Sequence, residues 1–354
     1  MNKKYNIIVP RLENSGPVNM AIEIGNVAHL KGWDVTLIGI SRGNKLNLEN
    51  IKYEVRYFKL SDFFKLRGII HTHCLRPDLL GWFFSFKNSC TLITTIHNHF
   101  LSDIGFTHSK IVTKLSFMLW VKAISRYDAR ICISNTMRKY YIRKTKCMKF
   151  DVIYNFKNTS IFSKFSSSEN LKWINLQIQN GKINLIYVGS FSERKNINFL
   201  IDAVTKYKNL SLIICGRGGD RFEEVKKLIM LNGANDRIYL AGEVDEIGDL
   251  IKASHFLVLP SHAEGLPMVV LEAASMGRPS LMSNIAVHRE LARMKLGEVF
   301  NRRDINDFYA TIIKAIQVYS LPPNSDSSLL EIFNSNFSGD ISFSKYLRAI
   351  GHES

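Results

Sequence analysis

The chain has 354 residues, of which 46% are hydrophobic and 22% are charged, a balance typical of soluble globular proteins. No uninterrupted apolar stretch of 18 residues occurs, which excludes an ordinary membrane-spanning helix, and Pro10 and Arg11 interrupt the first residues too early for a signal peptide. We therefore expect a cytoplasmic protein with two domains of ordinary size.

The formal net charge of +16 is distributed unevenly along the chain. Residues 1–165 contain 26 Lys and Arg against 10 Asp and Glu, whereas the remaining residues contain 21 of each sign. A basic first domain indicates a polyanionic partner, and both an acidic membrane surface and a nucleic acid have suitable charge. The alternative is that these charges only keep the domain soluble.

The first half alternates short apolar runs with helical patterns. Strands are expected at residues 5–9, 34–38, 53–58, 68–71 and 91–97, and helices at 18–30 and 77–86. Gly16 stands at the first strand-to-helix turn, where a Rossmann-like domain places a ligand loop, although a plain turn glycine is the alternative. The aromatic residues of the 77–86 helix are expected in the core, or alternatively at a bilayer surface: Trp82, Phe83, Phe84 and Phe86.

No set of residues is spaced as metal ligands. His71 and His73 alternate as strand residues do, and no third ligand follows nearby. The cysteines are scattered and without a C-x-x-C pair, and we expect them to be buried thiols: Cys74, Cys90, Cys132, Cys147 and Cys215.

Residues 109–150 contain two basic amphipathic helices around a short strand at 130–134. Their lysines and arginines are interleaved with Phe, Trp and Tyr, which is typical of helices that lie on anionic lipid. An RNA-binding surface would look similar, but no RNP, KH or zinc-finger pattern accompanies it. A membrane partner is therefore favoured over nucleic acid.

A Ser/Asn/Lys-rich stretch ends this domain, and we place the boundary near Phe165. Beyond it, strands are expected at 183–190, 210–216 and 237–242, with helices at 196–207, 220–231 and 246–253. Helices near 287–292 and 305–319 and a strand at 298–300 complete the domain. Strands separated by helix-length segments predict a parallel sheet.

The segment HFLVLPSHAEGLPMVVLEAASMGRPS, residues 255–280, predicts a buried strand, a tight loop and a helix at 267–276. The free N–H groups of that helix would face the carboxyl edge of the sheet, where doubly wound folds hold an anion such as phosphate. Glu264 and Glu272 flank this position and are expected to accept hydrogen bonds from neutral hydroxyls. The alternative is that both are ordinary solvated acids.

The segment from Glu264 to Glu272 resembles the E-x7-E motif of the retaining glycosyltransferases of family 4. The resemblance extends to HTHCLRPDLLG, TTIHNH, IYVGSFSERKNINFLIDAV, LSLIICGRGG and RIYLAGEV, in the order found in that family. It implies the GT-B fold: two Rossmann-like domains with parallel sheets facing across a cleft. The expected domains are 1–165 and 166–325, with helices in 326–354 crossing back to the first.

The resemblance implies roles for single positions. Family members have an arginine directly after the glycine that corresponds to Gly189 and a lysine five residues later, both on the donor diphosphate. Lys195 matches the lysine, whereas Ser190 stands at the arginine position, so Arg194 is expected to supply the second cation. The implied catalytic residues are Glu264, His97, Lys195 and Arg194, and the implied donor-binding residues are Gly16, Gly189, Ser190, Gly216, Val244, Gly265, Leu266, Pro267 and Glu272.

Together these observations predict a retaining hexosyltransferase that uses a nucleotide-diphosphate sugar, with a UDP-sugar favoured. Glu264 would orient the hexose, Glu272 the ribose, and His97, with His99 as a substitute, would contact the sugar from the first domain. No D-x-D triplet occurs, so we expect neither metal nor other cofactor. The expected acceptor is a lipid-linked or growing surface glycan, and the expected location is the inner face of the cytoplasmic membrane. The alternatives are a UDP-sugar 2-epimerase and an inactive nucleotide-sugar-binding scaffold.

Overall fold

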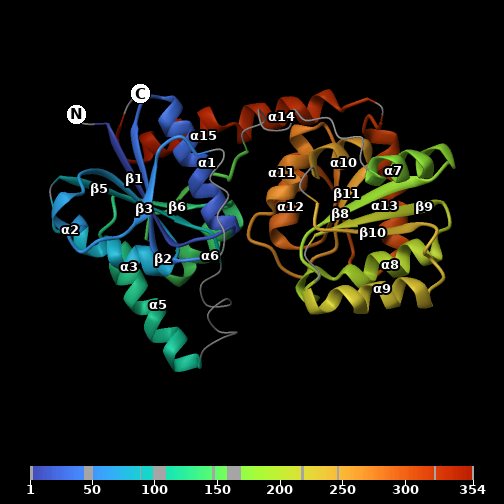
Figure 1. Cartoon of the computed structure of the whole chain (residues 1–354), viewed down its shortest axis with the longest axis horizontal. Coiled ribbons are helices and arrows are strands. Elements are labelled where there is room, and N and C mark those ends of the chain that lie inside the picture. The colour runs from blue at the N-terminus through green and yellow to red at the C-terminus, as the bar shows by residue number, and fades with distance from the viewer. Residues whose placement is uncertain are drawn as a thin grey trace. The chain divides into compact units, whose positions relative to one another are not determined.

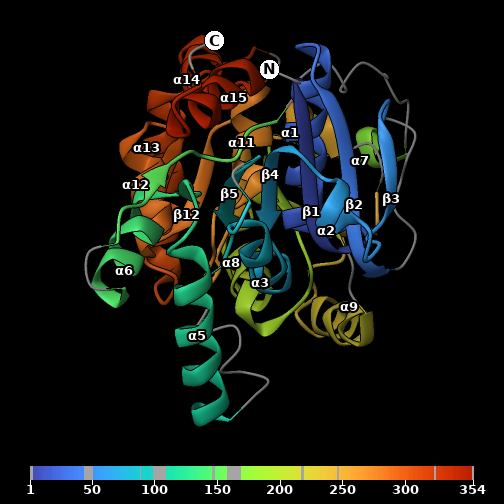
Figure 2. The same cartoon turned by 90° about the vertical axis from the view of Figure 1, so that its left-hand side faces the viewer.

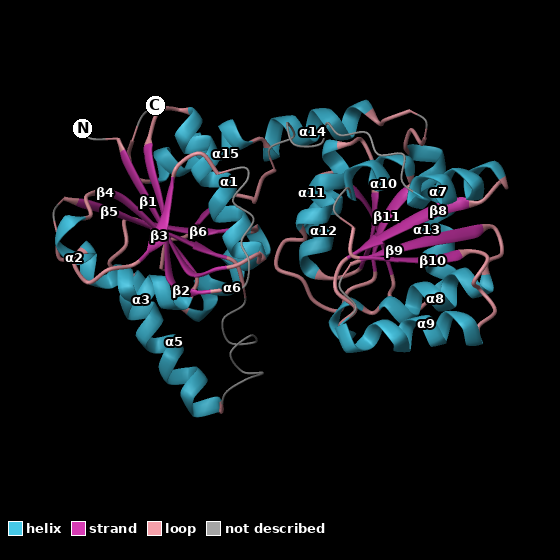
Figure 3. Ribbon diagram, viewed as in Figure 1, coloured by secondary structure: helices cyan, strands magenta, loops and turns pink. Residues whose placement is uncertain are grey.

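The computed structural model describes residues 3–43, 51–87, 89–98, 109–145, 148–157, 169–216, 219–244, 247–322 and 324–352. The chain divides into two compact units: unit 1 comprises Met1–Asn158 and Asn336–Ser354, and unit 2 comprises Thr159–Ser335. In each unit, helices cover both faces of a parallel sheet (Figure 1, Figure 3). The expected boundary near Phe165 lies outside the described residues.

In the described part of unit 1, seven parallel strands are arranged in the order β3-β2-β1-β4-β5-β6-β7. Its elements are β1 Lys4–Leu12, α1 Gly16–Leu30, β2 Asp34–Arg42, β3 Glu54–Tyr57, α2 Asp62–Lys65, β4 Gly68–His73, α3 Leu75–Phe84, β5 Cys90–Ile96, α5 Lys110–Ile124, β6 Ala129–Cys132, α6 Asn135–Lys144, β7 Asp151–Val152 and, near the end of the chain, α15 Gly339–Ala349.

The core of unit 1 forms where α1 and α15 pack on one face of this sheet. Tyr5, Ile7 and Val9 alternate along β1 and are fully buried on that face. The ring of Tyr5 lies 5.6 Å from that of Phe343 in α15, so the end of the chain is part of this core. Helix α3 contacts β1, β4 and β5, and α5 packs on α3 and extends away from the sheet (Figure 2).

In the described part of unit 2, six parallel strands are arranged in the order β10-β9-β8-β11-β12-β13. Its elements are α7 Glu169–Gln179, β8 Ile183–Val188, η2 Glu193–Lys195, α8 Ile197–Lys206, β9 Leu210–Cys215, η3 Gly219–Arg221, α9 Phe222–Leu231, β10 Ile238–Gly242, α10 Ile247–Ala253, β11 Phe256–Leu259, α11 Met268–Ser275, β12 Ser280–Ser283, α12 Ala286–Arg293, β13 Gly297–Phe300 and α13 Ile305–Val318, followed by α14 Ser327–Phe337, which leads to unit 1.

Most strand residues of unit 2 are apolar because both faces of the sheet are covered. Residues of α8, α9 and α13 pack with the side chains of β8 and β9 that point to their face, and these include Leu185 and Tyr187. Helices α7, α10 and α11 lie on the opposite face (Figure 1). This burial fixes the positions at which the strands end, and therefore the positions of the loops that follow them.

Several sequence expectations need correction. Strand β1 continues past Val9 to Leu12 because that stretch still pairs with β2. The buried strand β12 was not expected, since its four residues begin and end with serine. Phe83 and Phe86 do not lie in the core, because their side chains are 56% and 62% exposed, whereas Phe84 is buried.

The cysteines also differ from expectation. Cys132 and Cys215 are buried, whereas Cys74 and Cys90 are only partly buried, and Cys147 lies outside the described residues. All four described cysteines are free thiols. Among the helices that the structure describes, none combines the length and hydropathy needed to cross a membrane.

Candidate functional site

The strand order of unit 2 defines one edge at which a ligand is expected. Strands β8 and β11 are neighbours, but the chain leaves them toward opposite sides of the sheet, to β9 and to β12. In open α/β sheets, ligands bind at the carboxyl ends of the strands beside such a switch point. The loops at residues 189–196 and 260–267, which follow β8 and β11, are therefore the candidate site.

The two loops are tied to one another through their backbones. The amide of His262 donates to the carbonyl oxygen of Arg194 over 2.7 Å. The side-chain amide of Asn196 donates to the carbonyl oxygen of Pro260 over 3.2 Å. Asn196 has a φ of +54°, a left-handed conformation that asparagine tolerates better than most residues. These bonds hold the two loops in one arrangement.

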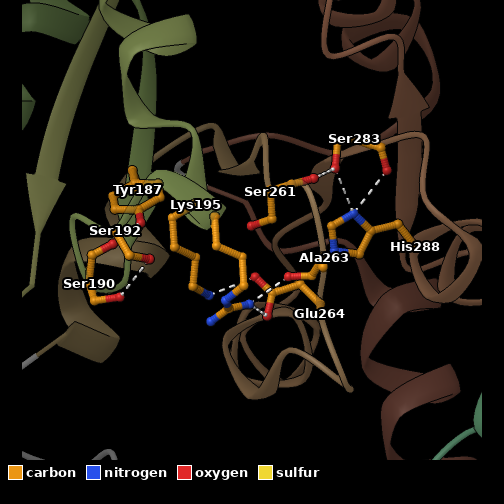
Figure 4. A network of polar contacts seen from close by, with 10 residues as sticks. Tyr187, Ser190, Ser192, Lys195, Ser261, Ala263, Glu264, Ser283 and His288 are labelled. Atoms are coloured by element: carbon orange, nitrogen blue, oxygen red, sulfur yellow. Dashed lines mark hydrogen bonds and ion pairs between the residues drawn. The ribbon is translucent and has the colours of Figure 1, made fainter. Parts of the chain in front are cut away.

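Glu264 is the centre of the side-chain contacts at this edge (Figure 4). The Nζ atom of Lys195 lies 2.7 Å from one carboxylate oxygen of Glu264, and Nη1 of Arg194 lies 3.0 Å from the other. Arg194 also donates to the carbonyl oxygen of Ala263. The side chains of Glu264, Lys195 and Arg194 are 7%, 13% and 49% exposed. The expected acid and the two expected cations thus form one cluster, with Arg194 as its accessible member.

The cations keep Glu264 ionised. Burial raises the pKa of this carboxyl, but the charge and hydrogen bond of Lys195 and the charge of Arg194 outweigh it, so the pKa lies below its ordinary value. Two cations and one carboxylate leave a net positive charge at the edge of the sheet. Such a cluster can bind an anion without any additional cation.

Helix α11 begins at the end of the same loop. Pro267 is its N-cap residue, not its first helical residue as expected, and its side chain makes no capping hydrogen bond. The amide of Val270 donates to the carbonyl oxygen of Pro267 over 3.1 Å, which leaves the amides of Met268 and Val269 at the helix N-terminus to bind an anion. Gly265 and Leu266 lead into this turn, and Glu272 lies partly buried in α11.

A set of residues behind Glu264 was not expected from the sequence. The hydroxyl of Ser283 donates to the carbonyl oxygen of Ser261 over 2.6 Å, and Nδ1 of His288 lies 2.9 Å from the carbonyl oxygen of Ser283. Burial lowers the pKa of His288 to about 4, so this ring is neutral. These contacts support the 260–267 loop from β12 and α12. No pattern around the isolated His288 predicts them.

The remaining expected donor-binding residues of unit 2 follow β8, β9 and β10. An added Cβ at Gly216 would lie 2.0 Å from the carbonyl oxygen of Gly189, so the backbones after β8 and β9 approach one another closely. Ser190 is exposed, and its hydroxyl lies 3.4 Å from that of Ser192. Val244 follows the end of β10. All four lie at the carboxyl edge of neighbouring strands.

The other two expected residues, Gly16 and His97, belong to unit 1. Gly16 is the first residue of α1, and apart from its chain neighbours no described atom lies within 4 Å of an added Cβ. His97 directly follows β5 and is buried, with Nε2 2.8 Å from Nδ1 of His73. Burial lowers the pKa of His97 to about 3. His99 lies outside the described residues.

Among the residues that the structure describes, no three or more His, Cys, Asp or Glu side chains are arranged to hold a metal ion.

Two parallel α/β units, with expected ligand residues at the carboxyl edges of both sheets, define a protein of the GT-B fold class. HepE from Anabaena, solved in complex with UDP, has this fold, with a TM-score of 0.80, 18% identity and coverage of 98% of this chain and 99% of that one. The family model described as Glycosyl transferases group 1 matches residues 170–324, and that of Glycosyltransferase Family 4 matches residues 15–160. The chain therefore belongs to the group 1 and family 4 glycosyltransferases.

Two curated relatives from Escherichia coli are both named as sugar transferases. The O-antigen biosynthesis glycosyltransferase WclY is 25% identical over 234 residues, which are 66% of this chain and 65% of WclY. The match therefore spans slightly less than two thirds of that relative. A UDP-Gal:alpha-D-GlcNAc-diphosphoundecaprenol alpha-1,3-galactosyltransferase is 25% identical over 279 residues, which are 76% of this chain and 69% of the relative.

Proposed function

We propose that this protein is a retaining hexosyltransferase of bacterial surface polysaccharide biosynthesis. It takes a hexose from a nucleotide-diphosphate sugar, with UDP as the favoured nucleotide, and transfers it to a lipid-linked or growing glycan. The names of the two relatives, one an O-antigen enzyme and the other a galactosyltransferase with a UDP-sugar donor and a diphosphoundecaprenol acceptor, support this proposal. UDP in the HepE complex agrees with the choice of nucleotide.

The observation that carries the proposal is the cluster of Lys195, Arg194 and Glu264 at the switch point of unit 2. A diphosphate is strongly anionic, and it would compete with Glu264 for the two cations. The exposed Arg194 side chain can turn toward it, whereas the more buried Lys195 needs to move little. Glu264 then has carboxylate oxygens available for sugar hydroxyls.

In the proposed reaction, the bond between the anomeric carbon and the diphosphate oxygen breaks, and a bond from an acceptor hydroxyl forms on the same face. The acceptor proton passes to the departing phosphate. Lys195, Arg194 and the first-turn amides of α11 stabilise the negative charge that develops on the leaving diphosphate. Glu264 orients the hexose, Glu272 binds the ribose, and His97 of unit 1 contacts the sugar. No metal is required, because side-chain cations take its place.

The proposal is tested with purified protein, anionic vesicles carrying polyprenyl-diphosphate saccharides, and a panel of UDP-, GDP- and ADP-sugars, with products identified by mass spectrometry. We expect transfer from one UDP-hexose, in the presence of EDTA, and at least a hundredfold loss of turnover in Glu264→Ala. Glu298→Ala is the matched control, because Glu298 lies in β13 and pairs with Lys314. An isomerised donor without transfer would instead identify an epimerase, and an unimpaired Glu264→Ala would reject this site.

The acceptor part of the proposal includes binding to an anionic membrane through α5. This helix carries exposed apolar side chains together with exposed lysines: Ile111, Val112, Leu115, Met118 and Leu119, with Lys110, Lys114 and Lys122. Phe83 of α3 and Phe86 are also exposed, and the guanidinium of Arg126 lies 4.7 Å from the centre of the Phe86 ring. Apolar groups enter the lipid boundary while each nearby cation contributes about 1 kcal/mol.

Co-sedimentation with vesicles tests this surface. We expect binding to phosphatidylglycerol vesicles, weaker binding to phosphatidylcholine vesicles, and loss of binding in Leu115→Ser/Leu119→Ser. The matched control is Met230→Ser/Leu231→Ser, an exposed apolar pair in α9 of unit 2. Equal loss in both variants would contradict the assignment to α5, and displacement of the vesicles by RNA would favour a nucleic-acid surface.

A further inference from the structure

Two histidines meet at the carboxyl edge of the unit 1 sheet. His73 is the last residue of β4 and pairs in register with Thr95 of β5, and His97 follows two residues later on the same face. Nδ1 of His73 lies 2.8 Å from Nε2 of His97, and the two rings are stacked with centroids 5.1 Å apart. The two side chains therefore share one hydrogen bond.

Both rings are neutral near pH 7. Burial lowers the pKa of His97 to about 3, and burial followed by the neighbouring histidines lowers the pKa of His73 well below its ordinary value. A neutral imidazole carries a single N–H. Hence one histidine donates in the shared bond and the other accepts, and only two proton arrangements are possible.

The second nitrogen of His73 distinguishes the two arrangements. Its Nε2 atom is buried and has no hydrogen-bond partner among the described residues. If His97 were the donor, His73 would carry its proton on Nε2, as a buried N–H without an acceptor, which native structures rarely contain. If His73 donates from Nδ1, its Nε2 is only an unused lone pair, and His97 carries its proton on Nδ1.

We infer that His73 is a positioning residue that holds His97 in the tautomer protonated on Nδ1. His97 then presents an uncharged N–H donor at the end of β5, and this donor suits a sugar hydroxyl. The assignment of a sugar as its ligand rests on the proposed function, whereas the tautomer follows from unit 1 alone.

The neighbouring His71 does not share this role. Its Nδ1 lies 2.9 Å from the hydroxyl of Tyr5 and its Nε2 lies 2.7 Å from the hydroxyl of Thr95. Thr95 in turn donates to the hydroxyl of Tyr346 in α15. Both nitrogens of His71 are thus occupied by this second chain of hydrogen bonds, which offers a control close to His97.

The tautomer is read directly from long-range proton–nitrogen correlation spectra of the full chain, labelled in its histidine rings. His97→Gln identifies the His97 signals by their disappearance. We expect His97 to be protonated on Nδ1 in the wild type and in Tyr346→Phe. We expect the same in His73→Asn, because the amide of the asparagine replaces the lost donor. In His73→Leu we expect a substantial population protonated on Nε2. A wild-type His97 protonated on Nε2, or a tautomer unchanged in His73→Leu, would overturn the inference.

Kinetics then connect the tautomer with the proposed reaction. We expect His73→Leu to lower kcat/KM for the sugar nucleotide about tenfold, as loss of one oriented hydrogen bond does, with recovery in His73→Asn and no change in Tyr346→Phe. Thermal unfolding separates this effect from misfolding. If the spectra show the expected tautomers but neither the wild type nor any variant transfers a sugar, the proposed function fails while the tautomer assignment stands. An altered tautomer with unchanged kcat/KM in an active enzyme would overturn the positioning role.

Discussion

Lys195 and Glu264 are 69 residues apart in the sequence, yet their charged atoms lie 2.7 Å from one another. The pair connects the loop after β8 with the loop after β11, the two loops at the switch point of the sheet. Both side chains are largely buried, whereas Arg194, which contacts the same carboxylate, is half exposed. Removal of one cation is therefore not equivalent to removal of the other.

We expect Lys195→Met to be more damaging than Arg194→Met. Loss of Lys195 leaves a buried carboxylate with one exposed partner, which lowers the free energy of unfolding by about 3 kcal/mol, whereas loss of Arg194 lowers it by no more than about 1 kcal/mol. Urea denaturation measures both. Calorimetric titration with UDP should show weaker binding in each variant. Equal destabilisation would mean that Lys195 is solvated in solution.

The location of this cluster was predictable from the sequence, but its contacts were not. Apolar runs that stop at Gly189 and Pro260, together with the alternation of strands and helices, predict two loops at one sheet edge. The direct pairing of Lys195 with Glu264 depends on the left-handed Asn196 and on loop-to-loop hydrogen bonds, and neither has a sequence pattern.

In unit 1, too, the location of a site residue was predictable from the sequence but its contacts were not. The strand ending at His97 was predicted, but its contact with His73 requires the register of β4 against β5, which only the folded sheet defines. The core was the first expectation for Phe83 and Phe86, because an aromatic helix beside a sheet usually faces the core, and their exposure agrees instead with the alternative of a surface position.

Asp78 should give unit 1 a characteristic dependence of stability on pH. Burial raises the pKa of this carboxyl from 3.8 to about 6, although hydrogen bonds from Thr72, Trp120 and Thr94 act in the opposite direction. Between those two pH values the folded chain holds a proton that the unfolded chain has released, so stability falls as the pH rises. We expect this group to lose about 3 kcal/mol over its whole titration, of which about 2 kcal/mol is lost between pH 4 and pH 6.

The contribution of Asp78 is isolated by subtraction. Unfolding by urea is followed from pH 4 to pH 7 in the wild type and in Asp78→Asn, because other carboxylates with lowered pKa values, such as Glu264, have the opposite slope. The free energy of unfolding of the wild type, minus that of Asp78→Asn, should increase steadily as the pH falls. A constant difference would show that Asp78 has the same, ordinary pKa in the folded and the unfolded chain.

Trp120 should contribute more to stability than Trp82. Nε1 of Trp120 donates to the buried carboxylate of Asp78 over 2.7 Å and so joins α5 to α3. Nε1 of Trp82 is buried without a hydrogen-bond partner among the described residues. We expect Trp120→Phe to lower the free energy of unfolding by about 2 kcal/mol more than Trp82→Phe, the range for a hydrogen bond to a charged group. If urea denaturation shows the same loss of free energy of unfolding in both variants, the effect of Trp120→Phe comes from the smaller ring alone.

Gly216→Ala should disturb the loop that carries Lys195 and Arg194 without touching either side chain. The added Cβ would lie 2.0 Å from the carbonyl oxygen of Gly189, so the backbone after β8 must move. The matched control is Gly219→Ala, because Gly219 also has a positive φ, +52°, but no described atom lies within 4 Å of an added Cβ. The control should lose only about 1 to 2 kcal/mol from its backbone conformation and retain UDP binding. Gly216→Ala should lose UDP binding at least tenfold in calorimetric titration, because a shift of the 189–196 loop moves both cations away from their contacts with Glu264. Equal binding in the two variants would show that the close approach of Gly216 to Gly189 does not position the cations.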